Sequence, residues 1–406
     1  MRILMVLPRF PYPLYKGDML RAYYQIKELS KNHEVYIVCL TEDTNFAQYL
    51  SELTPYCKKI EVVTLCGYQI VWNLLRGLFN KYPFQVNYFR SKVVKKKLKI
   101  LLEKYNIEVC YVQLIRMTLN VDYSYSCLYY LDYMDCFSAG MEKRSQYGNF
   151  LSKILFRWEA KRVKAFELHV AQKFHGYSVI SEADKKYFPP SLQPLITVIP
   201  NGIAKEFLEF EPAKEVEKDI DILFTGNMGY APNILAAIYL AHQILPLVKN
   251  YSPTVKVYLV GTNPSRKVRA LASSNVVVTG FVHDIKPYLV RSKVFVAPLF
   301  TGSGLQNKLL EAMAMRLPVL TTPLAAEALN AKNLHEVIIC KDAHEFSKAI
   351  YKVLTEPTWA QQIGNNARNF IQKQYSWKES TEKLINTWQE LKFQNFNVQN
   401  NSTLCS

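Results

Sequence analysis

Short apolar runs rich in Val, Ile, Leu and Tyr recur along this chain, and a helical pattern separates each run from the next. The runs lack the apolar–polar alternation of a strand with one face in water, so we expect strands that are buried on both faces. Strands that alternate with helices predict an α/β fold with doubly wound parallel sheets. We expect strands at residues 2–7, 34–40, 59–65, 109–114, 128–133 and 176–180, and a second series at 221–225, 255–260, 276–279, 294–297, 319–322 and 337–340.

The two series of strands predict two domains. A Pro-Asn-Gly turn at 200–202 and a charged stretch at 205–218 lie between them, and such segments mark domain boundaries. Ligands of open α/β sheets bind at the carboxyl ends of the strands, so we expect the two domains to face each other across a cleft. The expected parts are a Rossmann-like domain at 1–198, a second one at 199–376, a helix at 377–393 that packs back on the first domain, and a disordered tail at 394–406.

The composition excludes several classes of protein. With 49% hydrophobic and 21% charged residues, the chain is neither of low complexity nor mostly disordered. We find no apolar run of the roughly 18 residues that span a membrane and no signal-peptide pattern, so we expect a cytoplasmic protein. The eight cysteines and seven histidines show no metal-ligand spacing, and we expect neither a metal nor a cofactor. A net charge of +16 implies an anionic partner.

A glycine-rich segment joins the expected strand at 294–297 to a helix. Gly302 and Gly304 allow a ligand to approach the backbone, and the free N–H groups of the following helical turn favour an anion. Lys308 and Glu311 are three residues apart and share one helix face. The lysine can bind a phosphate, and the carboxylate can accept two hydrogen bonds from a vicinal diol such as ribose. Together they predict a nucleotide-diphosphate site, and a solvent-exposed Lys–Glu pair is the alternative.

The segment from Gly302 to Met315, followed by Pro318 to Pro323, resembles the donor-site signature of family 4 glycosyltransferases. More narrowly, it is similar to the G-x-Q-N-K-x-L-E-A-M-A-M form found in sugar transferases of bacterial exopolysaccharide (PEP-CTERM/EpsH-associated) clusters. The resemblance is colinear over most of the chain. It implies a GT-B fold with the donor in the C-terminal domain and the acceptor in the N-terminal domain. Further matching segments lie at residues 8–21, 132–138, 179–184, 199–202 and 224–233.

The resemblance implies a donor site built from two segments of the C-terminal domain, in which Lys308 and Glu311 act in catalysis. Many family members carry Arg and Lys after the first strand of that domain, where this chain has Gly226-Asn227-Met228. Ser303 replaces the first of the two glutamates of the broad family pattern. The full expected donor site is Gly226, Asn227, Gly302, Ser303, Gly304, Leu305, Gln306, Asn307, Lys308 and Glu311.

Two segments of the N-terminal domain are expected to contact the acceptor. The loop at 8–17 ends in Gly17, a helix opens at Asp18, and Arg21 stands one turn further. Two roles are open for this loop. One is contact with the acceptor or a phosphate, and the other is simple capping of the helix by Asp18. Asp135 and Ser138 follow the carboxyl end of a strand, so we expect them to reach the cleft, Asp135 as a catalytic residue. Their alternative role is to cap a helix.

Two acidic patterns resemble metal sites. Asp219-Ile220-Asp221 imitates a D-x-D motif, but it stands at the start of a strand, the wrong end for a ligand. Asp132 and Asp135 are three residues apart without further ligands. We therefore predict no metal at either place.

The segment from Trp72 to Lys104 carries nine basic residues and one acid, interleaved with bulky apolar side chains. This composition suits the surface of an anionic membrane. A solvated helix face over a core and a nucleic-acid site are the alternatives. In the context of the family, we expect a peripheral position on the inner face of the cell membrane and no nucleic-acid partner.

The resemblance implies a retaining, metal-independent glycosyltransferase. It would move a sugar from a nucleotide-diphosphate donor to a growing cell-surface glycan (exopolysaccharide, capsule or lipopolysaccharide) that is lipid-linked. Ser303 and the missing bases favour a different hypothesis, a non-catalytic carbohydrate-binding or scaffold protein with a degenerate donor site. A sugar-nucleotide epimerase of GT-B fold is a third possibility.

Overall fold

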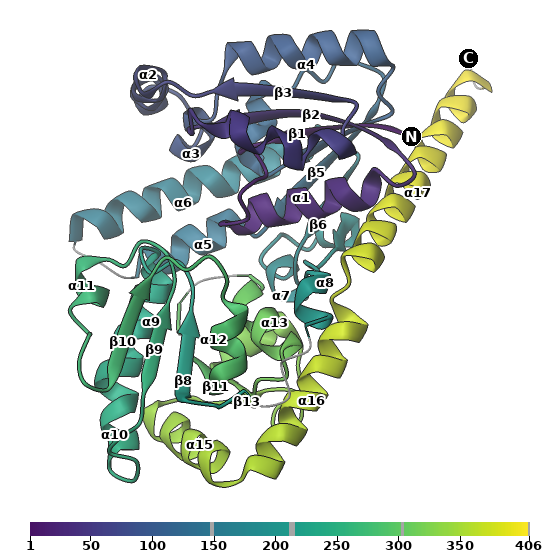
Figure 1. The fold of residues 1–406 in the computed structure, drawn as a ribbon. Coiled ribbons are helices and arrows are strands. Elements are labelled where there is room, and N and C mark those ends of the chain that lie inside the picture. The colour runs from purple at the N-terminus through teal and green to yellow at the C-terminus, as the bar shows by residue number, and fades with distance from the viewer. Residues whose placement is uncertain (147–149, 211–215, 302–303, 405–406) are drawn as a thin grey trace. The chain divides into compact units, whose positions relative to one another are not determined.

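The computed structural model describes residues 1–146, 150–210, 216–301 and 304–404, and the chain divides into two compact units. Unit 1 comprises Met1–Pro200 and Trp377–Ser406, and unit 2 comprises Asn201–Ser376. Each unit is built on one parallel sheet with helices packed against it (Figure 1). The predicted α/β fold with two doubly wound, Rossmann-like sheets is confirmed.

The sheet of unit 1 has the order β3-β2-β1-β4-β5-β6-β7. All of its neighbouring strands pair in parallel, which brings their carboxyl ends to one edge. The three-residue strand β7 was not expected from the sequence, because it is too short to show a pattern. The strands are β1 (Arg2–Leu7), β2 (Glu34–Thr41), β3 (Lys59–Thr64), β4 (Val109–Gln113), β5 (Leu128–Met134), β6 (Gly176–Val179) and β7 (Ile196–Val198).

Two apolar clusters cover the two faces of this sheet. This is seen in β1, where alternate residues belong to different clusters. Leu4 and Val6 lie in one, and Ile3 and Met5 lie in the other. The helices of unit 1 complete both clusters. They are α1 (Gly17–Leu29), η1 (Phe46–Glu52), η2 (Thr54–Tyr56), α2 (Gly67–Leu78), α3 (Phe84–Tyr88), α4 (Lys92–Tyr105), η3 (Ile115–Asn120), α5 (Phe137–Arg144), α6 (Phe150–Ala171), α7 (Glu182–Lys185), η4 (Gln193–Leu195) and α17 (Trp377–Leu404).

The C-terminal helix α17 belongs to unit 1 although it follows unit 2 in the chain. Trp388 is fully buried and meets the rings of Tyr111 and Tyr130 edge-on, and Trp377 stacks on Tyr24 of α1 at 5.2 Å. The helix continues to Leu404, so it is longer than expected from the sequence, which predicted a disordered tail from residue 394.

Unit 2 holds a second parallel sheet of order β10-β9-β8-β11-β12-β13. Its strands are β8 (Ile220–Thr225), β9 (Val257–Val260), β10 (Val276–Gly280), β11 (Ser292–Ala297), β12 (Val319–Thr321) and β13 (Ile338–Ile339). Its helices are α8 (Lys205–Leu208), α9 (Ala231–Tyr239), the π-helical η5 (Leu240–Ile244), α10 (Leu245–Lys249), α11 (Arg266–Arg269), α12 (Lys286–Arg291), α13 (Asn307–Ala314), α14 (Pro323–Leu329), α15 (Ala343–Thr355) and α16 (Pro357–Gln374).

One continuous helix in the described residues, Ala231–Lys249, is long and apolar enough to cross a membrane by length and composition. The sequence analysis did not expect such a helix. It buries Ala236, Leu240, Ile244 and Val248 within unit 2.

Candidate functional site

Two glycines let the loops after β8 and β9 come close together in unit 2. Gly226 directly follows β8 with a φ of +151°, and Gly261 follows β9 with a φ of +148°. A Cβ at Gly261 would lie 1.8 Å from the carbonyl oxygen of Gly226, and one at Gly226 would lie 2.8 Å from the side chain of Asn233. A larger residue at Gly261 would push the loops apart, and one at Gly226 would displace Asn233. The carboxyl end of the sheet is therefore compact at the predicted donor site.

The ammonium group of Lys308 lies beside these loops and is held by neutral groups. Its Nζ donates hydrogen bonds to Oδ1 of Asn233 at 2.6 Å and to Oε1 of Gln306 at 3.3 Å. It also lies 5.5 Å from the ring centroid of Phe224. Asn233 in turn donates from Nδ2 to the carbonyl oxygen of Asn227 at 2.9 Å. Amide oxygens and an aromatic ring orient a cation without cancelling its charge, so this charge remains for a ligand.

Lys308 and Glu311 lie three residues apart on α13, and both are partly buried. Burial lowers the pKa of Lys308 to about 8, and the carboxylate of Glu311 opposes this shift. Burial raises the pKa of Glu311 to about 7, and Lys308 opposes that shift. A solvent-exposed pair would keep its ordinary pKa values, so this alternative does not fit. Groups that titrate near neutrality in such a setting are typical of functional sites.

The loop before α13 contributes further expected donor residues. Gly304 has a φ of +78°, Leu305 is buried, and Gln306 donates from Nε2 to the carbonyl oxygen of Gly304 at 3.3 Å. Asn307, the first residue of α13, accepts a hydrogen bond from Asn201 at 3.1 Å. The structure thus brings Gly226, Asn227 and the segment 304–311, which comprises the end of the loop and the start of α13, together in unit 2. Gly302 and Ser303 lie outside the described residues.

Asn233 and Phe224 contact Lys308 but were missing from the predicted site. Asn233 lies in one of the segments that resemble the family, so a signal for it was present. Phe224 begins the same segment, but nothing in the sequence distinguishes this fully buried strand residue from the rest of the core.

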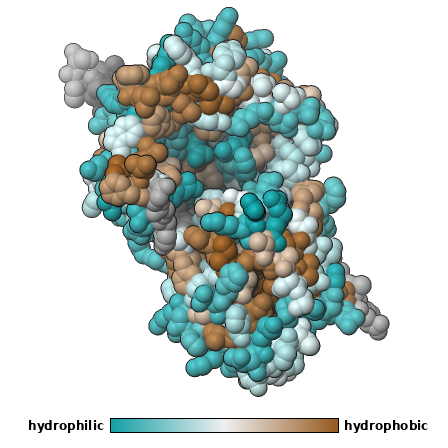
Figure 2. All heavy atoms as spheres, turned by 90° about the vertical axis from the view of Figure 1, so that its left-hand side faces the viewer, coloured by the Kyte–Doolittle hydropathy of each residue, from teal (hydrophilic) through white to brown (hydrophobic). Residues whose placement is uncertain are grey.

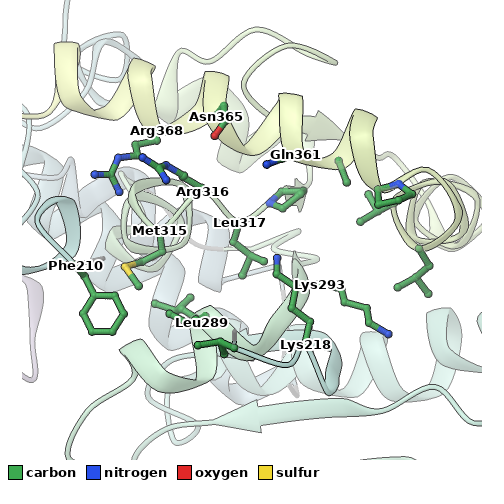
Figure 3. A pocket seen from close by; sticks show the side chains of 17 residues that line it. Phe210, Lys218, Leu289, Lys293, Met315, Arg316, Leu317, Gln361, Asn365 and Arg368 are labelled. Atoms are coloured by element: carbon green, nitrogen blue, oxygen red, sulfur yellow. The ribbon is translucent and has the colours of Figure 1, made fainter. Parts of the chain in front are cut away.

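At the opposite edge of the same sheet, the acidic residues are held in ion pairs. A hollow of about 650 Å³ lies near the amino ends of β8, β11 and β12, and Figure 3 shows Lys218 and Lys293 among its lining residues. In this region Asp221 is paired with Lys293 at 2.7 Å, and Asp219 with Arg291. No group of three or more potential metal ligands occurs in the described residues. Both carboxylates of the D-x-D pattern are thus used in ion pairs.

In unit 1, Arg21 is completely buried and holds a network of strand ends together. Its Nε donates to Oδ2 of Asp132 at 2.6 Å, and Nη1 donates to the carbonyl oxygen of Ile199 at 2.9 Å. Tyr111 and Ser178 also donate hydrogen bonds to Asp132. An acceptor contact by Arg21 would require the guanidinium to leave this pair. We therefore assign Arg21 a structural role and no longer propose it as a ligand-binding residue.

Asp18 neither caps its helix nor faces open solvent. The N-cap of α1 is Lys16, without a side-chain cap hydrogen bond, so the capping alternative is wrong. The carboxylate of Asp18 instead pairs with Arg9. Gly17 is the first residue of α1. Both stay predictions as acceptor residues.

Asp135 and Ser138 lie where β5 turns into α5. Burial raises the pKa of Asp135 well above its usual range, and the nearby Asp184 and Asp132 raise it further. The backbone N–H of Ser138 donates to Glu167 at 3.2 Å. The N-cap of α5 is Cys136, with no side-chain cap hydrogen bond, so neither residue caps the helix. The surroundings of Asp135 therefore favour the protonated form of its carboxyl group.

Comparison with known proteins connects this geometry to a family. Residues 219–356, which include β8, α9 and α13, match the family model described as Glycosyl transferases group 1. An uncharacterized 44.6 kDa protein in the cps region of Klebsiella pneumoniae is 23% identical over 404 residues, which cover 93% of this chain and 97% of that protein.

Two solved structures extend the likeness over both units. Sucrose-phosphate synthase from Thermosynechococcus elongatus has a TM-score of 0.71 at 16% identity, covering 96% of this chain and 99% of its own. Anabaena HepE in complex with UDP-glucose has a TM-score of 0.66 at 13% identity, covering 96% and 100%. The two parallel-sheet units thus form a GT-B fold, and residues 219–356 of unit 2 match the group 1 glycosyl transferase domain.

Proposed function

We propose that this protein transfers a sugar from a nucleotide-diphosphate donor to a growing cell-surface glycan, with retention of configuration and without a metal ion. The observation that carries the proposal is Lys308, a partly buried cation oriented by Asn233 and Gln306 at the carboxyl end of the unit 2 sheet. The relative in a cps region and the UDP-glucose complex of HepE support the glycan and the donor class.

In this proposal the residues of unit 2 act on the leaving group. Lys308 binds the diphosphate and stabilises the charge that develops as the sugar–phosphate bond breaks. The N–H groups of the first turn of α13 add to that stabilisation. These donors supply the counter-charge, so the proposal requires no divalent cation. Glu311, one turn further along α13, accepts hydrogen bonds from hydroxyl groups of the donor.

Asp135 is the proposed catalytic residue on the acceptor side. Burial and the neighbouring carboxylates raise its pKa, which favours the protonated form. In that form it can donate a hydrogen bond to the acceptor, whereas taking a proton from the attacking hydroxyl would first require its ionisation.

We also propose a peripheral position on an anionic membrane, with a lipid-linked acceptor. Helix α2 buries Asn73 and Gly77 and exposes its apolar side chains, an inverted arrangement for a helix of a soluble domain. Figure 2 shows apolar surface gathered on the upper part of the face that it presents. What we call the apolar surface of α2 and α6 consists of Tyr68, Val71, Trp72, Leu75, Leu78, Phe79, Phe150, Leu151, Ile154, Leu155 and Trp158, all exposed.

The contacts of Arg162 join the two helices of this surface. Arg162 of α6 donates to the carbonyl oxygens of Gly77 and Asn80 at 2.7 and 2.8 Å, and its guanidinium lies 4.3 Å from the ring of Trp158. Exposed basic residues of the same segments, Arg76 and Arg157 among them, suit an anionic leaflet. Helix α4 differs, because it buries Val94, Leu98 and Leu101 and exposes its lysines.

Donor binding and turnover test the catalytic proposal. A thermal-shift screen with UDP-, GDP-, ADP- and CMP-sugars should identify the donor, since a ligand at 100 times its Kd stabilises by about 2.7 kcal/mol. Glu311→Gln should then lower kcat/KM roughly ten- to hundredfold, because a charge-assisted hydrogen bond contributes about 1.5–3 kcal/mol. Turnover that survives EDTA supports metal independence. A protein that binds sugar nucleotides but neither hydrolyses nor transfers them would instead be the non-catalytic GT-B protein.

A vesicle flotation assay tests the membrane proposal. Leu75→Ser with Leu78→Ser removes two exposed leucines of α2, and Leu195→Ser with Leu334→Ser is the matched control at exposed sites elsewhere. Burying a leucine contributes about 1.5–3 kcal/mol, so the first pair should reduce binding to anionic vesicles at least tenfold and the control should not. Equal flotation of both variants would contradict the proposal.

A further inference from the structure

A cavity of about 310 Å³ lies in unit 1 near the carboxyl ends of β1 and β4. Arg9 comes two residues after β1, and Arg116 lies in η3, which follows β4. Leu74 of α2 and Phe84 of α3 line the same cavity. The cavity therefore combines two guanidinium groups with apolar side chains.

One aromatic ring holds the two guanidinium groups near each other. The Cζ atoms of Arg9 and Arg116 lie 5.8 and 5.5 Å from the ring centroid of Phe89, and Arg116 also lies 4.7 Å from the ring of Phe137. Arg116 donates from Nε to Oε1 of Gln85 at 3.3 Å. Among the described residues this is the hydrogen bond found for the Arg116 side chain, and the buried Nε2 of Gln85 has no hydrogen-bond partner.

Three cations, Arg9, Arg116 and Lys16, lie around the cavity with two carboxylates, Asp18 and Glu42, so one positive charge is in excess. Arg9 is paired with Asp18, and Glu42, which also lines the cavity, accepts a hydrogen bond from the hydroxyl of Tyr88 at 2.8 Å. Arg116 has no carboxylate within ion-pair distance among the described residues. Burial and the neighbouring Arg9 lower the pKa of Arg116 to about 10 and that of Lys16 also below its usual value. A bound anion would relieve both the repulsion and the desolvation.

We propose that this cavity binds the phosphate group of an amphiphilic acceptor, with Arg9 and Arg116 on the phosphate oxygens and Leu74 and Phe84 against the first carbons of its apolar chain. Guanidinium groups are well suited to phosphate because they offer planar, paired donors. Leu74 stands on α2, the helix that contributes half of the apolar surface of α2 and α6. The inference rests on the proposed function, since it names the class of its acceptor as a lipid phosphate.

Calorimetric titration of the full-length protein with hexyl phosphate, below its aggregation concentration, tests this assignment. We expect the wild-type protein to bind hexyl phosphate more tightly than inorganic phosphate and more tightly than hexanol. Arg116→Gln should weaken hexyl phosphate binding at least tenfold, and Arg9→Gln should weaken it as well. Arg269→Gln, at an exposed arginine of α11 in unit 2, is the matched control and should bind like the wild type.

The outcomes distinguish the phosphate contact of the ligand from its apolar contact. Unchanged binding of hexyl phosphate by Arg116→Gln, or equal binding of hexanol, would overturn the phosphate site. Equal affinity for inorganic phosphate would overturn the amphiphilic ligand. Circular dichroism and thermal unfolding confirm that the variants are folded, and Arg116→Lys, which keeps a charge, should recover part of the affinity. Titration of the wild type with UDP is independent of this site, so a failure of the donor proposal is distinguishable from a failure here.

Discussion

Arg21 in unit 1 and Lys308 in unit 2 are both basic residues near the start of a helix that follows the carboxyl end of a strand, yet they use their charges differently. Arg21 is fully buried against the carboxylate of Asp132, whereas Lys308 is held by the amide oxygens of Asn233 and Gln306. A carboxylate partner cancels the charge, and an amide partner orients it and leaves it available. The partner therefore decides whether such a residue serves the fold or a ligand.

The largest expected effect tests whether Arg21 stabilises the fold. Arg21→Ala leaves the buried carboxylate of Asp132 without its cation, and breaking a buried pair costs about 3–5 kcal/mol. Urea unfolding should show a loss of that size, with Arg269→Ala at an exposed site as the control. A loss below about 1 kcal/mol would show that Arg21 does not stabilise the fold and would reopen a role in ligand binding.

Lys308→Ala tests whether the charge of Lys308 serves a ligand. The affinity for a nucleoside diphosphate should fall roughly ten- to hundredfold, because the lost hydrogen bonds to phosphate are charge-assisted. The affinity for the nucleoside and the free energy of unfolding should change little. Lys267→Ala, at an exposed lysine of α11, is the matched control. Equal losses for the nucleoside and its diphosphate would mean that Lys308 does not contact phosphate.

The pH dependence of donor binding gives a smaller and graded effect. Lys308 has a pKa of about 8, so above that pH it loses its charge and the affinity should fall by up to tenfold per pH unit. Glu311 has a pKa of about 7, so below that pH it becomes protonated and accepts hydroxyl hydrogen bonds less well. Isothermal titration with the nucleotide sugar should show the tightest binding between these values. In Glu311→Gln the acid limb should disappear, and a limb that persists would assign it to another group.

The smallest expected effect concerns two neighbouring lysines of α4. Lys97 is paired with Glu61 and lowers the pKa of that carboxyl group, whereas Lys96 has no carboxylate partner among the described residues. Lys97→Gln should cost at most about 1 kcal/mol of stability, and Lys96→Gln should cost none. Both should weaken vesicle binding similarly if α4 faces an anionic membrane, by about 1 kcal/mol each. If neither variant changes flotation, α4 does not face the membrane. The apolar surface of α2 and α6 then remains the proposed membrane contact.

Much of the donor region could be predicted from the sequence because its signals are local. The spacing of Lys308 and Glu311 puts both on one helix face, and a strand, a loop and a helix follow one another within about 20 residues. The contact of Lys308 with Asn233 could not be predicted in this way, because 75 residues separate the two. Neither could the partly buried state of the pair, which shifts both pKa values toward neutrality.

The acceptor side was harder to predict for the same reason. Arg21 and Asp132 are 111 residues apart, so no local pattern distinguishes an arginine bound to a buried carboxylate from one that awaits a ligand. Arg116 carried no signal in the sequence, since its environment comes from residues of η3, α3 and α5 together. The orientation of the helices within residues 72–104 could not be predicted either. Helix α2 exposes most of its apolar side chains, whereas α4 buries Val94, Leu98 and Leu101.

The sequence by itself determined the alternation of buried strands and helices, and hence the two parallel sheets, because strand burial and helix amphipathicity are recorded in the order of neighbouring residues. It also determined which ends of the strands carry polar and glycine-rich loops. The tertiary structure alone decided which charges are neutralised and which are left for ligands. That decision depends on distance and burial between residues far apart in the chain, and electrostatic free energies change more with these two quantities than with residue type.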